Sequence, residues 1–519
     1  MTLHGQHLIA SARTRAGSLT FHGVNASTQA NLEPAYTEAT TQEIGSACRA
    51  AEQAFPSFSN STGGERAAFL EAIAAEIEAL GDDLLQRAHQ ETGLPLPRLT
   101  GERARTCAQL RLFATVAREG SWVDARIDPA QPDRKPLPRP DVRRMLRPLG
   151  PVGVFGASNF PLAFSVGGGD TASAFATGNT VVVKAHPAHP GTSEMVAEAI
   201  TRAVARCQLP PGVFSIIHGR QPVTSVALVR HPSIQAVGFT GSRTAGRALF
   251  DAACTRPRPI PVFSEMSSVN PVFVLPAALR ENGAAIAEGL KNSFTLGVGQ
   301  FCTKPGLVFG IASPEWETFV DTLGKSAKSA ARGTMLHSGI ATAFEHSLDE
   351  LKKYTWVVRE GNAVARVSAD QFRTDPDLAK ERFGPFTLVV TAKSFEDLTT
   401  IAANLEGQLT GTIHASGSDL PQAATLVSLL ERIAGRVLIN GFPTGVEVCH
   451  AMNHGGPYPA STDARFTSVG SAALLRFVRP VCYQDLPDSL RPDALKDANP
   501  LGLLRLVNGK PTHEAVKPA

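Results

Sequence analysis

Pro151-Val-Gly-Val-Phe155 and Thr180-Val-Val-Val-Lys184 are two short apolar runs separated by a segment with helical patterning. Similar runs follow, and the predicted strands are Val152–Phe155, Thr180–Lys184, Val213–Ile217, Ile234–Phe239 and Ile260–Phe263. The predicted helices that accompany them are Pro161–Thr177, Gly191–Cys207, Val223–Val229 and Thr244–Ala253. Apolar strands alternating with helices are typical of a doubly wound parallel sheet. The pattern therefore predicts the α/β class and a nucleotide-binding type of domain.

The segments before this sheet have a different pattern. Helical patterning dominates the first 118 residues, with apolar positions every three or four residues in Gln42–Phe55 and Gly64–Gly93. Gly93 and Pro95 are expected to end the second of these helices. Residues 119–147 hold five prolines among Arg and Asp, which indicates an exposed arm or hairpin.

The segments after the sheet are less regular. A second α/β stretch runs from Pro271 to about Gly470, with strands that are harder to delimit. The tail after Pro480 is rich in Pro and Asp and holds one apolar patch, Leu501–Val507.

Composition removes several classes of protein. The 519 residues are 43% apolar and 19% charged, so the chain can bury a large core and is neither disordered nor fibrous. The net charge of +3 is nearly balanced, and no basic run alternates with aromatics, so nucleic acid and membrane surfaces are not expected as partners. The uncharged segment Pro148–Gly169 holds six Gly and three Pro, which excludes a single membrane-spanning helix there.

The cysteines and the N-terminus bear on the compartment. Seven Cys, an odd number without a C-x-x-C pair, predict reduced thiols. Met1–Arg15 has no apolar core of a secretory signal. A cytoplasmic location is therefore expected.

One cysteine lies in a loop suited to chemistry. Cys302 is part of Gly297-Val-Gly-Gln-Phe-Cys-Thr-Lys-Pro-Gly306, where glycines precede it and Lys304 follows. A nucleophilic thiol must be accessible and stabilised as thiolate by donors or positive charge, and such a loop allows both. By local composition alone, a lone Cys in a Gly-rich loop is more often incidental.

Two polar residues at strand ends are further candidates. Glu265 follows an apolar strand in Phe263-Ser-Glu-Met-Ser-Ser268, and in a poorly solvated cleft its pKa would rise toward that of a general base. A Glu that faces water is the alternative. Asn159 lies between a strand and a helix, where its amide could donate to an oxyanion or simply cap the helix.

The nucleotide signal is a strand that turns into a helix. In Phe239-Thr-Gly-Ser-Arg-Thr-Ala-Gly246 the chain turns through Gly241, and the helix N-terminus that follows could face a phosphate. Lys184 at a strand end could reach a ribose or phosphate, or could be solvated. His186 and His189 have the spacing of two metal ligands but no third ligand in the nearby sequence, so no metal is expected.

Taken in order, these segments resemble the aldehyde dehydrogenase superfamily along almost the whole chain. The matching segments are Glu91–Pro95, Gly150–Pro161, Val181–Lys184, Phe239–Ser242, Ser264-Glu265, Gly299–Cys302, Glu381–Pro385 and Asn440–Pro443. Eight segments in register are specific, and they outweigh the local alternatives above.

The resemblance implies a role for each site residue. Cys302 is similar in position to the nucleophile that attacks an aldehyde, with Asn159 and the Cys302 amide holding the oxyanion and Glu265 activating water. The implied coenzyme residues are Lys184, Gly241, Ser242, Glu381 and Phe383. The implied coenzyme is NADP or NAD, with a homodimer or homotetramer as the assembly.

The departures from the family pattern bear on the branch. Many NAD-preferring members have Lys-Pro-x-Glu where this chain has Lys184-Ala-His-Pro187, and without that carboxylate a 2′-phosphate is acceptable, so NADP is favoured. The loop Glu265-Met-Ser-Ser268 replaces the common Glu-Leu-Gly-Gly.

The segments similar to the α-ketoglutaric semialdehyde (2,5-dioxopentanoate) dehydrogenase branch are Lys184–Ser193, Gln300–Gly306 and Gly441–His450. An NADP-dependent medium- or long-chain aliphatic aldehyde dehydrogenase is the alternative, and an esterase of the same fold is disfavoured because the coenzyme segments are intact. Phe160 and Phe301 are expected to form an apolar tunnel wall. Arg465 is the candidate for a substrate carboxylate, with a surface pair to Asp463 as its alternative.

The resemblance also suggests a domain plan. Residues 1–118 and 148–262 would form the coenzyme-binding domain, and 263–470 the catalytic domain. Residues 119–147 and 471–490, with a strand near Ala472–Val478, would form an oligomerisation arm that extends a neighbour's sheet, and 491–519 a C-terminal extension.

Overall fold

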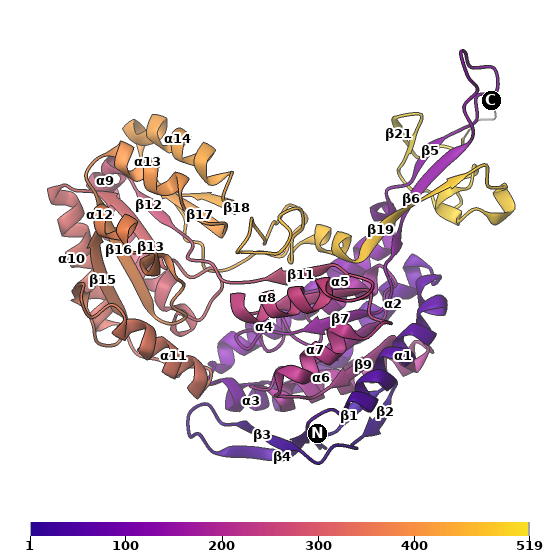
Figure 1. The fold of residues 1–519 in the computed structure, drawn as a ribbon, viewed down its shortest axis with the longest axis horizontal. Coiled ribbons are helices and arrows are strands. Elements are labelled where there is room, and N and C mark those ends of the chain that lie inside the picture. Colours follow the sequence, from indigo (N-terminus) through magenta and orange to yellow (C-terminus); the bar gives the residue numbers. More distant parts are fainter. Residues whose placement is uncertain (1, 517–519) are drawn as a thin grey trace.

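The computed structural model describes residues 2–516 and consists of two α/β units and an arm that projects from them (Figure 1). The first unit is built on a seven-stranded sheet of order β11-β10-β7-β8-β9-β1-β2. Its strands are β1 (His7–Ile9), β2 (Ala12–Thr14), β7 (Val152–Phe155), β8 (Val181–Lys184), β9 (Phe214–Ile217), β10 (Ala236–Thr240) and β11 (Val262–Glu265). The strands β7 to β11 are parallel, and the five strands predicted from the apolar runs are confirmed to within two residues at each end.

The N-terminal forty residues form strands, so the prediction of dominant helical patterning was wrong there. Strand β1 pairs antiparallel with β9, and Leu8 and Ile9 are buried against the sheet. Strands β3 (Thr20–Val24) and β4 (Asn31–Thr37) form a separate antiparallel ribbon. These runs are too short to show a period, and what fixes them is pairing with partners far along the chain.

Helices cover both faces of the first sheet. They are α1 (Thr41–Ser59), α2 (Gly63–Ala79), α3 (Gly81–Thr92), α4 (Leu96–Glu119), α5 (Gly169–Ala176), α6 (Pro190–Arg206), α7 (Pro222–Arg230) and α8 (Arg243–Cys254). The segment predicted as one helix to Gly93 is two, because Gly81 adopts a left-handed φ of 58° that starts a new helix. Gly93 ends α3 as a left-handed C-cap, as predicted.

The predicted helix Pro161–Thr177 is helical only in its second half. Residues before Gly169 form turns, and the Glu102 carboxylate accepts hydrogen bonds from the amides of Leu162 and Ala163. A Cβ on Gly168 would lie 2.4 Å from the Ala163 carbonyl oxygen, so the glycines permit a tight fold of the chain. The segment after β7 therefore reaches the site as a compact loop.

The second unit is built on a sheet of order β14-β15-β16-β13-β12-β17-β18, parallel except for β14. Its strands are β12 (Val272–Val274), β13 (Leu307–Ile311), β14 (Thr355–Val358), β15 (Ala363–Ser368), β16 (Phe386–Ala392), β17 (Gln408–His414) and β18 (Ala434–Ile439). Its helices are α9 (Pro276–Thr295), α10 (Pro314–Ser329), α11 (Ser338–Asp349), α12 (Ala369–Thr374), α13 (Phe395–Ala403) and α14 (Leu420–Leu430). Two apolar cores lie on opposite faces of this sheet, which is the arrangement of a doubly wound unit.

The arm is a five-stranded sheet of order β19-β6-β5-β20-β21 (Figure 1). Its strands are β5 (Arg126–Asp128), β6 (Val142–Pro148), β19 (Val478–Gln484), β20 (Arg505–Val507) and β21 (Lys510–Thr512). The strand expected at Ala472–Val478 begins only at Val478, because residues 471–477 form a 3₁₀ helix that packs in the first unit's core. The apolar patch of the tail pairs with β5, so the C-terminal segment belongs to the arm sheet.

Two further features concern the chain as a whole. Of the helices within residues 2–516, none combines the length and apolar character that crossing a bilayer requires. All seven cysteines are free, in line with the expectation of reduced thiols.

Candidate active site

The Cys302 loop is held in place by close contacts with two other segments. Gly297, Val298 and Gly299 have left-handed φ angles of 57°, 59° and 65°. A Cβ on Gly299 would lie 2.2 Å from the Gly384 carbonyl oxygen, so only glycine allows this approach. The Asn270 side chain donates hydrogen bonds to the carbonyls of Cys302, at 2.8 Å, and Lys304, at 2.9 Å. The thiol is therefore presented by a rigid turn.

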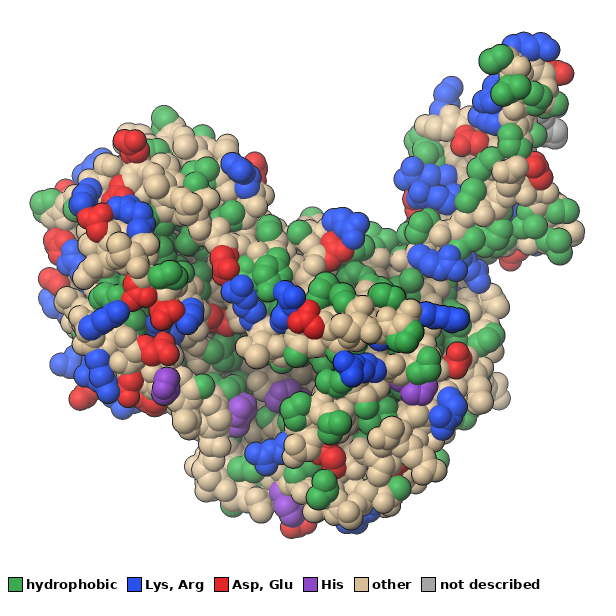
Figure 2. Space-filling model, viewed as in Figure 1, with side chains coloured by type: hydrophobic (Ala, Val, Ile, Leu, Met, Phe, Trp, Pro, Cys, Tyr) green, Lys and Arg blue, Asp and Glu red, His purple; other side chains and the backbone are tan. Residues whose placement is uncertain are grey.

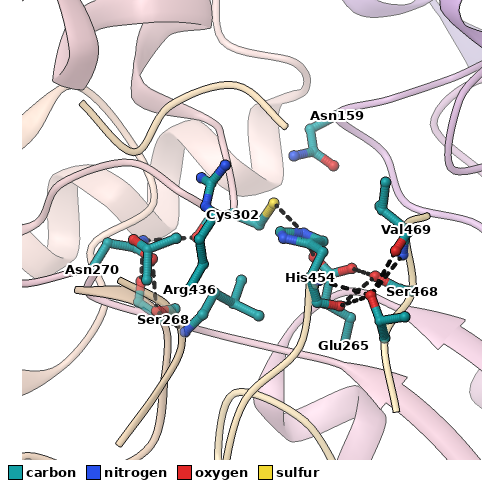
Figure 3. A network of polar contacts seen from close by, with 12 residues as sticks. Asn159, Glu265, Ser268, Asn270, Cys302, Arg436, His454, Ser468 and Val469 are labelled. Carbon is teal, nitrogen blue, oxygen red and sulfur yellow. Dashed lines mark hydrogen bonds and ion pairs between the residues drawn. The ribbon is translucent and has the colours of Figure 1, made fainter. Parts of the chain in front are cut away.

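A histidine that the sequence did not single out lies between the thiol and the carboxylate (Figure 3). The Nε2 of His454 is 2.8 Å from Oε1 of Glu265 and 3.5 Å from Sγ of Cys302. The Ser468 hydroxyl donates to the other Glu265 oxygen at 2.6 Å. His454 and Glu265 are buried, so these contacts form away from bulk water. The arrangement gives a proton on the thiol a direct path to an acceptor.

The pKa of Glu265 is lowered, whereas the sequence predicted that it would be raised. Burial raises the pKa of this carboxyl, as predicted, but the charge of His454 and the hydrogen bonds of His454 and Ser468 outweigh burial and hold the pKa below its usual value. Glu265 is therefore ionised at neutral pH and accepts protons without first losing one.

The thiol is protonated in the free protein. Burial, followed by the charge of Glu265, raises the pKa of Cys302 well above its ordinary value. Lys304 does not stabilise a thiolate as the sequence suggested, because its Nζ donates to the carbonyls of Arg382 and Phe386 at 2.8 and 3.0 Å. The nucleophile must therefore lose its proton during the reaction, and the Glu265 carboxylate, which is held ionised, is the adjacent acceptor.

Asn159 faces the thiol across the cavity (Figure 3). Its Nδ2 donates to the Gln300 carbonyl at 2.9 Å, and its own backbone carbonyl accepts from Arg98 at 3.0 Å. The next residues are not helical, so the alternative role of helix cap does not apply. An amide fixed in this way is a preorganised donor for an oxyanion.

A cavity of about 360 Å³ joins these groups to the first unit's sheet. Figure 2 shows the surface hollowed between the two α/β units. Of the predicted site residues, those that line the cavity are Asn159, Phe160, Gly241, Ser242, Glu265, Cys302, Glu381 and Phe383. Phe301 is buried behind it, with its ring 5.2 Å from that of Phe160.

Groups of the kinds that hold dinucleotides in proteins lie in and beside the cavity, with Lys184 outside the lining. Ser242 is the N-cap of α8, so the first amides of this helix lie beside the cavity next to Gly241. Lys184 is buried at the end of β8, and burial lowers its pKa to about 8. This ammonium makes no hydrogen bond or ion pair with any of residues 2–516, so a ligand hydroxyl or phosphate would satisfy it. These observations fit a nicotinamide coenzyme.

Arg465 does not reach the cavity. Its side chain is 80% exposed, and its guanidinium donates to Asp463 at 2.5 and 2.9 Å, which is the surface pair named as its alternative. The two residues lie two positions apart in an exposed turn, so the pair forms locally. A substrate carboxylate must find another partner.

The Cys302 thiol, the His454 imidazole and the Glu265 carboxylate could also hold a metal ion. Within residues 2–516, Glu265, Cys302 and His454 are the group whose ligand atoms all lie within 4.8 Å of one another, and zinc accepts all three ligand types. The expectation that the protein uses no metal stays a prediction.

Comparisons with known proteins give one consistent result. Residues 14–466 match the model of the aldehyde dehydrogenase family. The chain is 49% identical to α-ketoglutaric semialdehyde dehydrogenase 2 of Azospirillum brasilense, covering 98% of this chain and all of that protein. It is 48% identical to α-ketoglutaric semialdehyde dehydrogenase of Acinetobacter baylyi, covering 98% of each. A structure of 1-pyrroline-5-carboxylate dehydrogenase from Thermus with bound NAD superposes with a TM-score of 0.78 at 19% identity, covering 92% of each chain.

Proposed function

Because the chain belongs to the aldehyde dehydrogenase family, whose members oxidise aldehydes with NAD(P), we propose that it converts α-ketoglutaric semialdehyde to 2-oxoglutarate. The single observation that carries the chemistry is the contact of Cys302 and Glu265 with one imidazole, opposite Asn159. The substrate is supported by two relatives of that name at 48 and 49% identity over nearly the full chain.

Cys302 is the proposed nucleophile. As its Sγ bonds to the aldehyde carbon, its proton moves to the His454 and Glu265 pair, and the carbonyl oxygen becomes an oxyanion. The Asn159 amide and the Cys302 backbone N–H donate to that oxygen. Loss of hydride from the tetrahedral carbon leaves a thioester on Cys302, and the thiol proton passes from Glu265 to solvent. Glu265 then takes a proton from the water that cleaves the thioester and returns it to the departing thiolate. The products are a carboxylic acid and the free thiol.

NAD(P) supplies the hydride acceptor when bound. We propose that Lys184 binds the adenosine ribose, that Ser242 and Gly241 place the α8 N-terminus at the pyrophosphate, and that Glu381 holds the nicotinamide ribose beside Phe383. Burial raises the pKa of Glu381. Its carboxyl is therefore poorly solvated, and contact with ribose hydroxyls would replace lost water.

The proposed function is tested by absorbance at 340 nm with NADP and with NAD against a panel of aldehydes. We expect kcat/KM for 2,5-dioxopentanoate to exceed that for every unbranched alkanal from butanal to dodecanal. A value that rises steadily with alkanal length and passes that of 2,5-dioxopentanoate would instead support an aliphatic aldehyde dehydrogenase.

We propose that the enzyme uses NADP at least as readily as NAD, because position 187, three residues after Lys184, is Pro and not a carboxylate. Replacing Pro187 by Glu should raise KM for NADP by about tenfold or more through repulsion of the 2′-phosphate, and leave KM for NAD within about twofold. Pro187→Gln is the matched control without charge. Rejection of NADP by the unaltered enzyme would contradict the proposal.

The arm is proposed as the element of assembly. Strand β19 is an edge strand of the arm sheet and β18 an edge strand of the second unit's sheet, so each offers unpaired backbone groups to a second copy. Figure 2 shows apolar side chains exposed on the arm among basic ones. Light scattering should give a multiple of 54.9 kDa. A monomer at micromolar concentration would rule this assembly out.

A further inference from the structure

Arg105 is a cation without a polar partner at the edge of the site. It lies on α4, its Nη1 is fully buried, and within residues 2–516 it makes no hydrogen bond or ion pair. Arg98, two turns earlier on the same helix, differs because its guanidinium donates to Glu102 and to the Asn159 carbonyl. A desolvated guanidinium nitrogen without an acceptor is costly, and such groups in proteins call for an explanation.

The position of Arg105 relates it to the reacting groups. Its guanidinium carbon is 5.1 Å from the ring centre of Phe164 and 5.9 Å from that of Phe160, and both rings line the cavity. The Phe164 ring is in turn 6.2 Å from the His454 ring. The charge of Arg105 also acts against the rise in the pKa of Cys302. The guanidinium therefore stands beside the apolar wall of the cavity, within electrostatic range of the thiol.

The carboxylates near Arg105 either accept hydrogen bonds from other groups of the protein or are exposed to solvent. Glu102 accepts from Arg98 and from two backbone amides, and Glu265 accepts from His454 and Ser468. Glu447 is exposed on its loop and makes no hydrogen bond to Arg105. One turn further along α4, Gln109 is buried with both amide atoms unpartnered. On the same face of α4, Arg105 and Gln109 therefore both have side-chain atoms without a hydrogen-bond partner among residues 2–516.

We propose that Arg105 is the specificity-determining residue that binds the distal carboxylate of the substrate, in place of the exposed Arg465. This inference rests on the proposed function, since it requires an aldehyde that carries a carboxylate. A five-carbon chain spans about 5 Å between its end carbons. Its far end can therefore approach the Phe160 and Phe164 rings, beside which the Arg105 guanidinium lies, while Cys302 meets the aldehyde. A fork of N–H donors matches a carboxylate in two hydrogen bonds, while the Phe160 and Phe164 rings pack on the chain between.

The test compares Arg105→Met with Arg111→Met. Arg111 lies on the same helix but on its exposed face, paired with Glu78, so its replacement controls for loss of one Arg from α4. Loss of charge-assisted hydrogen bonds should lower kcat/KM of Arg105→Met for 2,5-dioxopentanoate by about 10- to 100-fold, mainly through KM, and leave pentanal within about twofold. Glutarate, a dicarboxylate that cannot react, should inhibit pentanal oxidation competitively in the unaltered enzyme and in Arg111→Met, and at least tenfold more weakly in Arg105→Met.

The outcomes separate this inference from the function on which it rests. If the unaltered enzyme does not favour 2,5-dioxopentanoate over pentanal, the proposed substrate is wrong. If it does, and Arg105→Met retains both that preference and inhibition by glutarate, the role of Arg105 is overturned. An equal loss for both aldehydes would also overturn it, because it marks a purely structural residue. Should Arg105→Met not fold, Arg105→Lys keeps the charge but loses the fork, and an undiminished preference in that variant would count against the two-bond contact.

Discussion

Replacing Cys302 by Ser is expected to abolish dehydrogenase turnover, with a loss on the order of 10⁴-fold or more, as when an enzyme loses its nucleophile. Burial and the nearby Glu265 carboxylate already raise the pKa of the thiol, so the site disfavours an anion at this position. A serine hydroxyl, which ionises far less readily than a thiol, would not be activated there. Among the described residues that line the cavity, Cys302 is the only cysteine. The measurement is the steady-state rate of absorbance increase at 340 nm.

The same variant should retain its fold and its coenzyme site. Cys302 does not contact Lys184, Ser242 or the α8 N-terminus in any hydrogen bond, so coenzyme affinity by calorimetry should stay within a fewfold of the unaltered value. Cys254→Ser, at an exposed thiol on α8, is the matched control and should keep full activity. Turnover of Cys302→Ser above about 1% of normal would remove Cys302 from the proposed role.

Replacing Glu265 by Gln is expected to slow thioester hydrolysis by about 10²- to 10⁴-fold, the usual contribution of a general base. Gln keeps the size of the side chain and can still accept from Ser468, but it cannot take a proton from water. Without the Glu265 charge, the His454 Nε2 beside the thiol is left as the acceptor of its proton, so the first turnover should still release reduced coenzyme while the steady state is slow. Rapid mixing should show a pre-steady-state burst close to one equivalent per active site.

The structure predicts a second result for the Glu265→Gln variant, a change in the pH dependence of the burst. Since Glu265 and Cys302 both contact His454 Nε2, removing the charge of Glu265 also removes one cause of the raised Cys302 pKa. In Glu265→Gln the Cys302 pKa should consequently be lower, and the burst should stay fast at lower pH than in the unaltered enzyme. Glu447→Gln, at an exposed carboxylate on the neighbouring loop, should change neither phase. A folded Glu265→Gln without any burst would contradict the assignment of Glu265 to the hydrolytic step.

The sequence by itself determined the parallel sheet and the chemistry-bearing loops. Buried parallel strands need continuous apolar runs, so β7, β8 and β10 are readable from local pattern. The glycines of the Cys302 turn are visible in the local sequence, but the reason that Gly299 must be glycine, its approach to Gly384, is a tertiary contact. Motifs in register then predicted the family, which the comparisons confirm, and with it the coenzyme residues proposed above.

Only the tertiary structure decided which distant segments make contact and which side chains these contacts remove from water. His454 is 152 residues from Cys302, and a lone histidine in a loop has no periodicity or spacing that ties it to a thiol. The pKa of Glu265 falls rather than rises because burial competes with partners that folding brings to it, and no local pattern encodes that balance. Likewise Arg465 and Arg105 are both arginines among polar neighbours in the sequence. The fold leaves the first in water beside Asp463 and desolvates the second beside Phe164, and desolvation is a property of the packed chain rather than of any segment of it.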